Sequence, residues 1–86
     1  MKGTVMFVNP KNGFFAVKVD GGDYTIVETL GGDVEGGDVI SGKLHSLRGE
    51  DLYNETQRVR LSAFIQDFHC TDDVARAMVF PERRLQ

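Results

Sequence analysis

The stretch NPKNGFFAVKV, residues 9–19, decides the fold. Pro10 fixes the φ angle of one turn residue, and the Asn-Gly pair that follows supplies positive φ, so a tight turn is predicted. The apolar residues on either side predict two strands, 4–9 and 14–20, that form a hairpin. Its lysines and adjacent phenylalanines leave two interpretations open: a surface that stacks nucleic-acid bases, or rings that fill a small core.

Further apolar segments predict more strands, separated by glycine-rich turns. The expected strands run over 24–28, 39–47 and 52 to about 68, the last as one strand or a bent pair, with connections at 21–23, 29–38 and 48–51. In the last segment four apolar residues occupy every second position: Val59, Leu61, Ala63 and Ile65. This period of two predicts a strand with one buried face.

The end of the chain has a different pattern. Thr71 is a helix N-cap candidate, and the two aspartates after it suit the positive end of a helix dipole. A helix is predicted over about 72–80, and a flexible tail over 81–86. Apolar residues on one face of this helix are Val74, Ala77 and Met78. We expect the helix to lie on the strands and plug one end of a barrel.

Together these elements predict an all-β fold. Five strands, with tight early hairpins and a longer link before the fourth, indicate a small Greek-key barrel of the OB type, with one short C-terminal α-helix. The 86 residues are enough for one domain, 1–86, with one small core. Phe64 and Phe68 are expected to pack in the barrel or beneath the helix.

Composition favours a cytoplasmic protein. Apolar residues make up 41% and charged residues 27% of the chain, which is ordinary for a globular domain. The single cysteine, Cys70, has no internal disulfide partner, which favours a reducing compartment. No apolar run approaches the roughly 20 residues that span a bilayer, and no signal peptide is evident, so a membrane partner is not expected.

Charge is unevenly distributed along the chain. The net charge is −3, which disfavours strong nonspecific binding to nucleic acid. However, residues 1–19 contain Lys2, Lys11 and Lys18 and no acid, whereas residues 20–38 contain six acids and no base. A local basic face is one interpretation of this asymmetry, and two ordinary solvated faces are the other.

The first third of the chain, Gly3 to Glu28, resembles the first three strands of cold-shock domains. That family has a pattern like G-x-V-K-W-F-N, then K-G-F-G-F-I, then V-F-V-H. The corresponding stretches here are GTVMFVN, NGFFAV and TIVE, at 3–9, 12–17 and 25–28. The resemblance implies an OB barrel that binds single-stranded RNA or DNA on aromatic side chains of these strands, without catalysis.

The resemblance also implies roles for individual residues. Phe7, in place of the family's tryptophan, and Phe14 would stack bases, while Lys2, Lys11 and Lys18 would contact phosphates. Phe15 stands where the family has glycine and either points into the core or shifts the aromatic surface. Other family positions are changed: Ala16 and Ile26 replace phenylalanines, and Glu28 replaces a histidine with an acid that repels phosphate.

A second basic patch is predicted on the later strands. Arg58 and Arg60 are expected to face outward there, beside Lys43 and His45 of the neighbouring strand. In that case they would add to a nucleic-acid surface. The alternative is that the arginines pair with nearby acids such as Glu55, which contributes little to stability.

Two other functions were weighed against nucleic-acid binding. An acidic balance and an added helix fit a protein-interaction or regulatory module, or a homodimer, with Phe7, Phe14 and Ile26 as its apolar patch. A cysteine or metal enzyme would use His69-Cys70, but ligand spacing and a third catalytic group are missing. No nucleotide-binding or hydrolase motif occurs, so we expect no enzyme, cofactor, metal or small-molecule substrate.

Overall fold

The predicted hairpin is present in the computed structural model, which describes residues 1–81. Strands β1 (Lys2–Asn9) and β2 (Phe14–Val19) pair antiparallel, and Gly13 in the turn between them has φ of 77°. The Asn9 side chain shapes this turn, because its Oδ1 accepts a hydrogen bond of 3.0 Å from the Lys11 backbone N–H. An asparagine that binds the backbone two residues on is a common device in tight turns.

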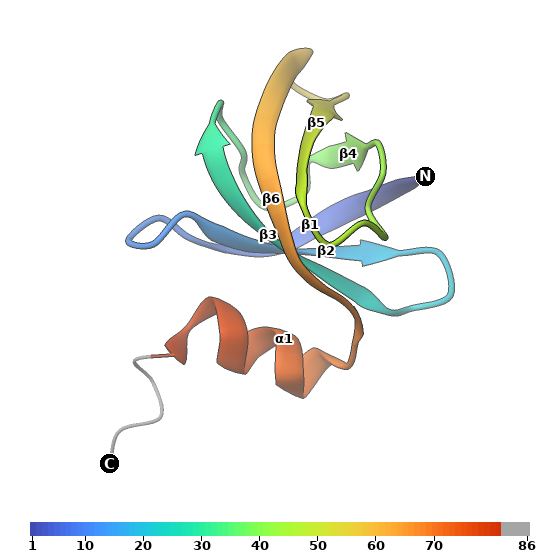
Figure 1. Cartoon of the computed structure of the whole chain (residues 1–86), viewed down its shortest axis with the longest axis vertical. Coiled ribbons are helices and arrows are strands. Elements are labelled where there is room, and N and C mark those ends of the chain that lie inside the picture. The colour runs from blue at the N-terminus through green and yellow to red at the C-terminus, as the bar shows by residue number, and fades with distance from the viewer. Residues whose placement is uncertain (82–86) are drawn as a thin grey trace.

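Six strands close into one antiparallel barrel (Figure 1). After the hairpin come β3 (Tyr24–Gly31), β4 (Val39–Ser41), β5 (Gly49–Asn54) and β6 (Val59–Cys70). Their order around the barrel is β1-β2-β3-β6-β5-β4, so the link after β3 passes across the barrel to bring β4 beside β1. The prediction of a small all-β barrel with a C-terminal helix is confirmed, with six strands rather than five.

The extra strand comes from the second half of the chain, where two boundaries were predicted wrongly. The fourth strand ends at Ser41 rather than at residue 47, and β5 covers most of the segment predicted as a hairpin connection. The true turn follows Asn54, whose Oδ1 accepts hydrogen bonds from the backbone N–H groups of Thr56 and Gln57. A side-chain acceptor, rather than a glycine, therefore reverses the chain here, so the segment predicted as one strand or a bent pair belongs to two antiparallel strands.

The barrel interior holds the larger hydrophobic core. Its members share the inward face of the strands: Val5, Phe15, Val17, Val19, Val27, Ile40, Leu44, Leu52, Leu61, Ala63 and Ile65. In β6, the predicted alternation is present at Leu61, Ala63 and Ile65, which are buried. Val59, the first residue of the strand, is exposed. Each large apolar side chain buried here contributes roughly 1.5–3 kcal/mol to folding.

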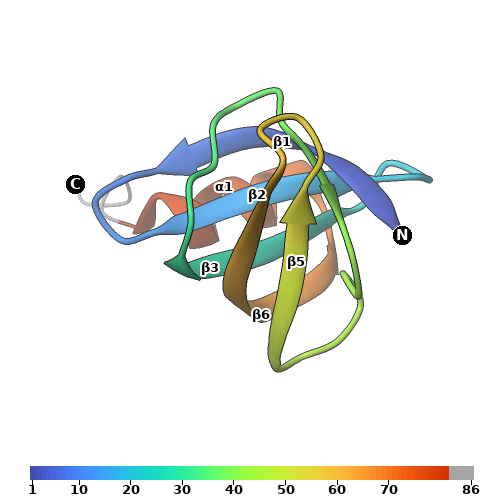
Figure 2. The same ribbon diagram turned by 90° about the horizontal axis from the view of Figure 1, so that it is seen from above.

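A second core lies on the outside of the barrel, beneath the helix. Helix α1 (Asp72–Val79) packs against β1, β2 and β3 (Figures 1 and 2). The fully buried members of this core are Ala16, Tyr24, Ile26, Cys70, Ala75 and Val79. The helix therefore covers a sheet face. The prediction that it plugs one end of the barrel is wrong. Its buried residues are Ala75 and Val79, whereas Val74 is exposed.

The N-terminus of α1 follows the sequence prediction. Thr71 is the N-cap, and its hydroxyl accepts a hydrogen bond of 3.4 Å from the Val74 backbone N–H. The helix ends at Val79, two residues before Pro81. Residues 82–86, most of the predicted flexible tail, lie outside the described residues.

Candidate functional site

The positions that correspond to the base-stacking platform share the outer face of β1–β3. A β-bulge in β1 lies between Val5 and Phe7, and it sets Phe7 opposite Ala16 of β2. Ala16 in turn pairs with Ile26 of β3. Phe7 therefore projects toward the same outer core as Ala16 and Ile26. Helix α1 covers this part of the platform, so Ala16 and Ile26 are completely buried.

The ring of Phe7 is enclosed by the helix and by β3. Its centroid lies 5.9 Å from the Tyr24 ring and 6.0 Å from the Phe80 ring. The guanidinium carbon of Arg76 lies 4.7 Å from the same centroid, within the range of a cation–π interaction. Phe7 thus seats α1 instead of presenting an open ring, and the expected apolar patch of Phe7, Phe14 and Ile26 is not an exposed surface.

Polar contacts fix both ends of α1 on the barrel. At its start, the Tyr24 hydroxyl donates a 2.8 Å hydrogen bond to Asp72, and Arg76 Nε donates another to the same carboxylate. The bond from Arg76, and then that from Tyr24, hold the pKa of Asp72 below its usual range. The bond to Asp72 is also the main reason why the pKa of Tyr24 is raised.

At the other end of α1, the β1–β2 turn binds the helix directly. The side-chain amides of Asn9 and Asn12 donate to the backbone carbonyl oxygen of Val79, at 2.8 Å and 3.3 Å. Helix C-termini leave carbonyl groups without intrahelical partners, and these amides satisfy one of them. The β1–β2 turn, which the sequence predicted to contact nucleic acid, therefore holds the C-terminal end of α1.

Phe15, a predicted site residue, has no exposed surface. It is completely buried in the barrel core, beside Val8 of β1 in the strand register. Adjacent strand residues point to opposite faces, so Phe14 takes the outer position and Phe15 the inner one. No ring face of Phe15 is available to a ligand.

One strip of the platform remains open beyond the end of α1. In the strand register Phe14 of β2 lies opposite Glu28 of β3, and Glu28 lies opposite Phe64 of β6. Phe64 is 39% exposed and does not pack in the barrel as expected. Glu28 Oε1 accepts a hydrogen bond of 2.9 Å from Gln66 Nε2. In this strip an acidic side chain lies between two aromatic rings.

A basic and aromatic strip runs around another part of the barrel. Lys2 pairs with Ser41, Ser41 with Tyr53, and Tyr53 with Arg60, so four strands contribute to one transverse row. The register thus joins Lys2 and Arg60, which had been assigned to separate patches. No carboxylate among residues 1–81 forms an ion pair with either of them. We call this row the Lys2–Arg60 strip.

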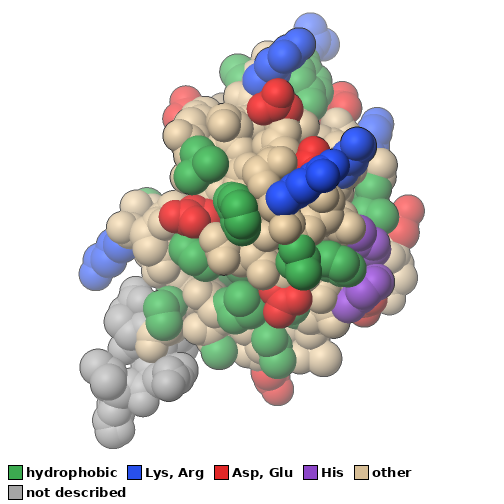
Figure 3. All heavy atoms as spheres, in the orientation of Figure 1, with side chains coloured by type: hydrophobic (Ala, Val, Ile, Leu, Met, Phe, Trp, Pro, Cys, Tyr) green, Lys and Arg blue, Asp and Glu red, His purple; other side chains and the backbone are tan. Residues whose placement is uncertain are grey.

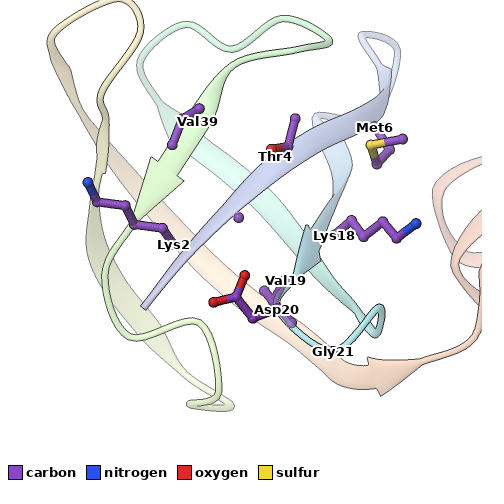
Figure 4. Close-up of a pocket in the computed structure, with 9 residues that line it drawn as sticks. Lys2, Thr4, Met6, Lys18, Val19, Asp20, Gly21 and Val39 are labelled. Carbon is purple, nitrogen blue, oxygen red and sulfur yellow. The ribbon is translucent and has the colours of Figure 1, made fainter.

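A shallow hollow of about 450 Å³ adjoins this strip on β1 and β2. Lys2, Thr4, Met6 and Lys18 line it, together with Asp20 (Figure 4). Lys2 and Lys18 extend to opposite sides, with their amines pointing away from each other (Figure 4). The two lysines therefore do not converge on one phosphate-sized group, although both are exposed at the rim.

The remaining predicted cations lie apart from the platform. Lys11 is exposed in the β1–β2 turn, and Arg58, with φ of 61°, lies in the turn before β6 rather than in the strand. Lys43 and His45 lie in the link between β4 and β5, not on a strand beside the arginines. Glu55 does not pair with Arg58 but accepts a hydrogen bond from the Ser41 hydroxyl.

The cysteine and the histidines lie near one another without forming a catalytic arrangement. Burial, and then the neighbouring Asp67 carboxylate, raise the pKa of the Cys70 thiol to about 11, so it stays protonated at neutral pH. The rings of His45 and His69 are 4.5 Å apart, and His69 Nδ1 lies 3.0 Å from Asp23. Within residues 1–81, no three His, Cys, Asp or Glu side chains are grouped to hold a metal ion.

Comparison with protein-family models, curated proteins and solved structures gives no match for this chain. No helix within the described residues is long and apolar enough to cross a membrane.

Proposed function

We propose that this chain is a non-enzymatic protein-interaction module, in which α1 takes the position that a nucleic-acid strand takes on the platform of cold-shock domains. The observation that carries the proposal is the enclosure of Phe7 by Tyr24, Phe80 and Arg76. Phe7 is only partly exposed, and these contacts with its own chain reduce the ring surface that it can offer to a base.

The chemistry of the platform supports the same proposal. Ala16 and Ile26 provide a surface of small and aliphatic groups, which suits the packing of a helix that presents Ala75 and Val79. At the open end of the platform Glu28 carries a negative charge, which repels a phosphate backbone. The face that remains exposed near Glu28 includes Leu30 and Phe64, and aromatic side chains are enriched in protein–protein interfaces.

A site-specific crosslink tests the proposal. A photoreactive phenylalanine analogue placed at Leu30, which is 61% exposed, should form discrete protein adducts in cells that express the full chain. The same analogue at Asp73, on the exposed side of α1, serves as the matched control and should not form those adducts. Adducts with nucleic acid at position 30, or no adduct different from the control, would contradict the proposal.

A second candidate function is weak binding of single-stranded RNA or DNA. The Lys2–Arg60 strip favours it, because an exposed tyrosine between two cations that form no ion pair within residues 1–81 can stack one base while the cations contact phosphates. Amide chemical shifts followed during titration with a mixed-sequence oligonucleotide test it. Shifts at Lys2, Tyr53 and Arg60 that decrease with added salt would support this function.

The same titration separates the two possible nucleic-acid surfaces. If binding instead used the platform predicted from the resemblance, the salt-sensitive shifts would be at Phe7, Lys11 and Phe14 and would be accompanied by changes throughout α1. Tyr53→Ala should weaken binding on the Lys2–Arg60 strip and leave binding on the platform unchanged. An oligonucleotide that produces no shift at low salt would exclude both surfaces.

A further inference from the structure

The row formed by Phe14, Glu28 and Phe64 has the composition of a site for a cationic head group. Neighbouring strands are about 4.8 Å apart, so the two phenylalanine backbones lie roughly 10 Å from each other along the sheet, with Glu28 between them. All three side chains face outward: Phe14 is half-buried at the edge of the outer core, and Phe64 lies between the inward-facing Ala63 and Ile65.

Within residues 1–81 the carboxylate of Glu28 forms no ion pair. Its side chain is half-buried, and it accepts a hydrogen bond from the neutral amide of Gln66. A partly buried carboxylate is more stable beside an opposite charge, and residues 1–81 place no ion-pair partner beside this one.

The surroundings of Glu28 leave space for such a charge. On β5 the residue opposite Phe64 is Gly49, which has no side chain to cover the far side of the ring. A hollow of about 300 Å³ lies next to the row rather than within it, lined by Leu30, Gly49, Glu50, Asp51, Ser62 and Ala63. Figure 3 shows this face, over β3 and β6, where acidic and basic side chains lie among exposed hydrophobic ones.

We propose that this row binds the ammonium or guanidinium group of a lysine or arginine presented by a protein partner. A cation above Glu28 would lie about 5 Å from each flanking strand, within the roughly 6 Å over which an aromatic ring attracts a cation. The carboxylate supplies the ion pair, both rings supply cation–π contacts, and Leu30 packs against the aliphatic stem. The proposal rests on the proposed function, because it specifies the chemistry of the partner.

A phosphate-bearing polymer is a poor alternative at this position. Glu28 repels phosphate, and no lysine or arginine lies in the row or opposite it in the strand register. The cations that would attract nucleic acid are on the Lys2–Arg60 strip, on other strands. Charge therefore favours a basic protein segment over RNA or DNA here.

Titration of the full chain with three short peptides tests the site directly. The peptides consist of Gly and Ser around one central residue, which is lysine, arginine or the uncharged norleucine. We expect the lysine and arginine peptides to shift the amides of Phe14, Glu28 and Phe64 and the carboxylate carbon of Glu28, and the norleucine peptide to leave them unchanged.

Three variants identify the source of the affinity. Glu28→Gln keeps an oxygen for Gln66 but removes the charge, and it should weaken binding about 5-fold or more. Phe64→Leu keeps an apolar group but removes the ring, and it should weaken binding about 2- to 5-fold. Glu35→Gln removes an exposed acid outside the row and should change nothing. Equal binding of the norleucine peptide, or binding that is insensitive to Glu28→Gln, would overturn the proposal.

The crosslink at Leu30 distinguishes failure of this site from failure of the proposed function. Protein adducts that persist unchanged in Glu28→Gln would contradict the cation site and leave the interaction module intact. Charge-dependent binding of the peptides without any protein adduct would support the cation site and contradict the interaction module. Loss of the adducts in Glu28→Gln, but not in Glu35→Gln, would support both.

Discussion

The side-chain amide of Asn9 donates a hydrogen bond to the backbone carbonyl oxygen of Val79, 70 residues later in the sequence, at 2.8 Å. Asn9 is almost completely buried, and its Oδ1 also accepts from the Lys11 backbone N–H. One side chain therefore shapes the first hairpin turn and holds the last turn of α1.

Replacing Asn9 should loosen the helix more than replacing Asn12 does. Asn9→Ala leaves a buried carbonyl without this donor and should lower the free energy of unfolding by about 1–3 kcal/mol. Asn12→Ala removes a longer bond, 3.3 Å, from an exposed side chain and should cost less than about 1 kcal/mol. Urea denaturation measures both. Equal effects would contradict the stronger role assigned to the buried Asn9 in holding Val79.

The two adjacent phenylalanines should differ strongly when each is truncated. Phe15→Ala creates a cavity in the barrel core and should destabilise the protein by about 3–5 kcal/mol. Phe14→Ala removes a half-buried ring from the edge of the outer core and should cost about 1–2 kcal/mol. Denaturation curves measure the difference. A larger loss for Phe14→Ala would contradict the assignment of Phe15 to the barrel interior.

Acid should release α1 through Asp72. The bonds from Arg76 and Tyr24 hold the pKa of Asp72 below its ordinary value of 3.8. A group with a depressed pKa stabilises the folded state above its unfolded pKa, and this contribution is lost as the pH falls through the folded pKa. We therefore expect the amide signals of Ala75 and Val79 to move toward disordered values as the pH falls below about 4.

Asp72→Asn provides the control for this acid transition. Asp38 also has a lowered pKa: burial opposes its ionisation, but hydrogen bonds from Asn54, the Glu35 backbone and Gln57 outweigh that effect. Acid therefore weakens the barrel as well as the helix. The amides of α1 should lose their additional pH dependence in Asp72→Asn while those near Asp38 keep theirs. If the helix responds to acid equally in the variant and the parent, Asp72 is not its acid-sensitive group.

Cys70 should react slowly with thiol reagents. Its pKa of about 11 leaves very little thiolate at pH 8, compared with a free cysteine of pKa about 8.5. Modification by a disulfide reagent should be on the order of 100-fold slower in the folded protein than in urea. Fast labelling of the folded protein would contradict the burial of Cys70 beneath α1.

The hairpin, the barrel class and the N-cap of α1 could be predicted from local sequence. Turn residues and β-branched alternation depend on backbone preferences that neighbouring residues determine, and Thr71 with two aspartates after it is a strong helix start. The end of β4 at Ser41 was missed because Leu44 is buried from a loop, where its apolar character resembles that of a strand residue.

The position of α1 was missed, although the sequence contains a signal for it. Residues 15–17 and 24–27 are each buried without interruption, and strands that bury consecutive side chains are covered on both faces. The runs FFAV and YTIV therefore indicate a second layer over β2 and β3. The Phe14–Glu28–Phe64 row depends on the register between β3 and β6. Glu28 and Phe64 are 36 positions apart in the sequence, and no local pattern specifies their pairing.

The distance along the chain between Asn9 and Val79 also has a consequence for synthesis. At a translation rate of about 5–20 residues per second, the first hairpin is synthesised roughly 4–14 seconds before the helix that covers it. During that interval Phe7, Ile26 and Tyr24 have no α1 to pack against, and a nascent chain with uncovered apolar surface is a substrate for chaperones. The ribosome-bound intermediate of this protein would thus have the open platform that the finished molecule closes.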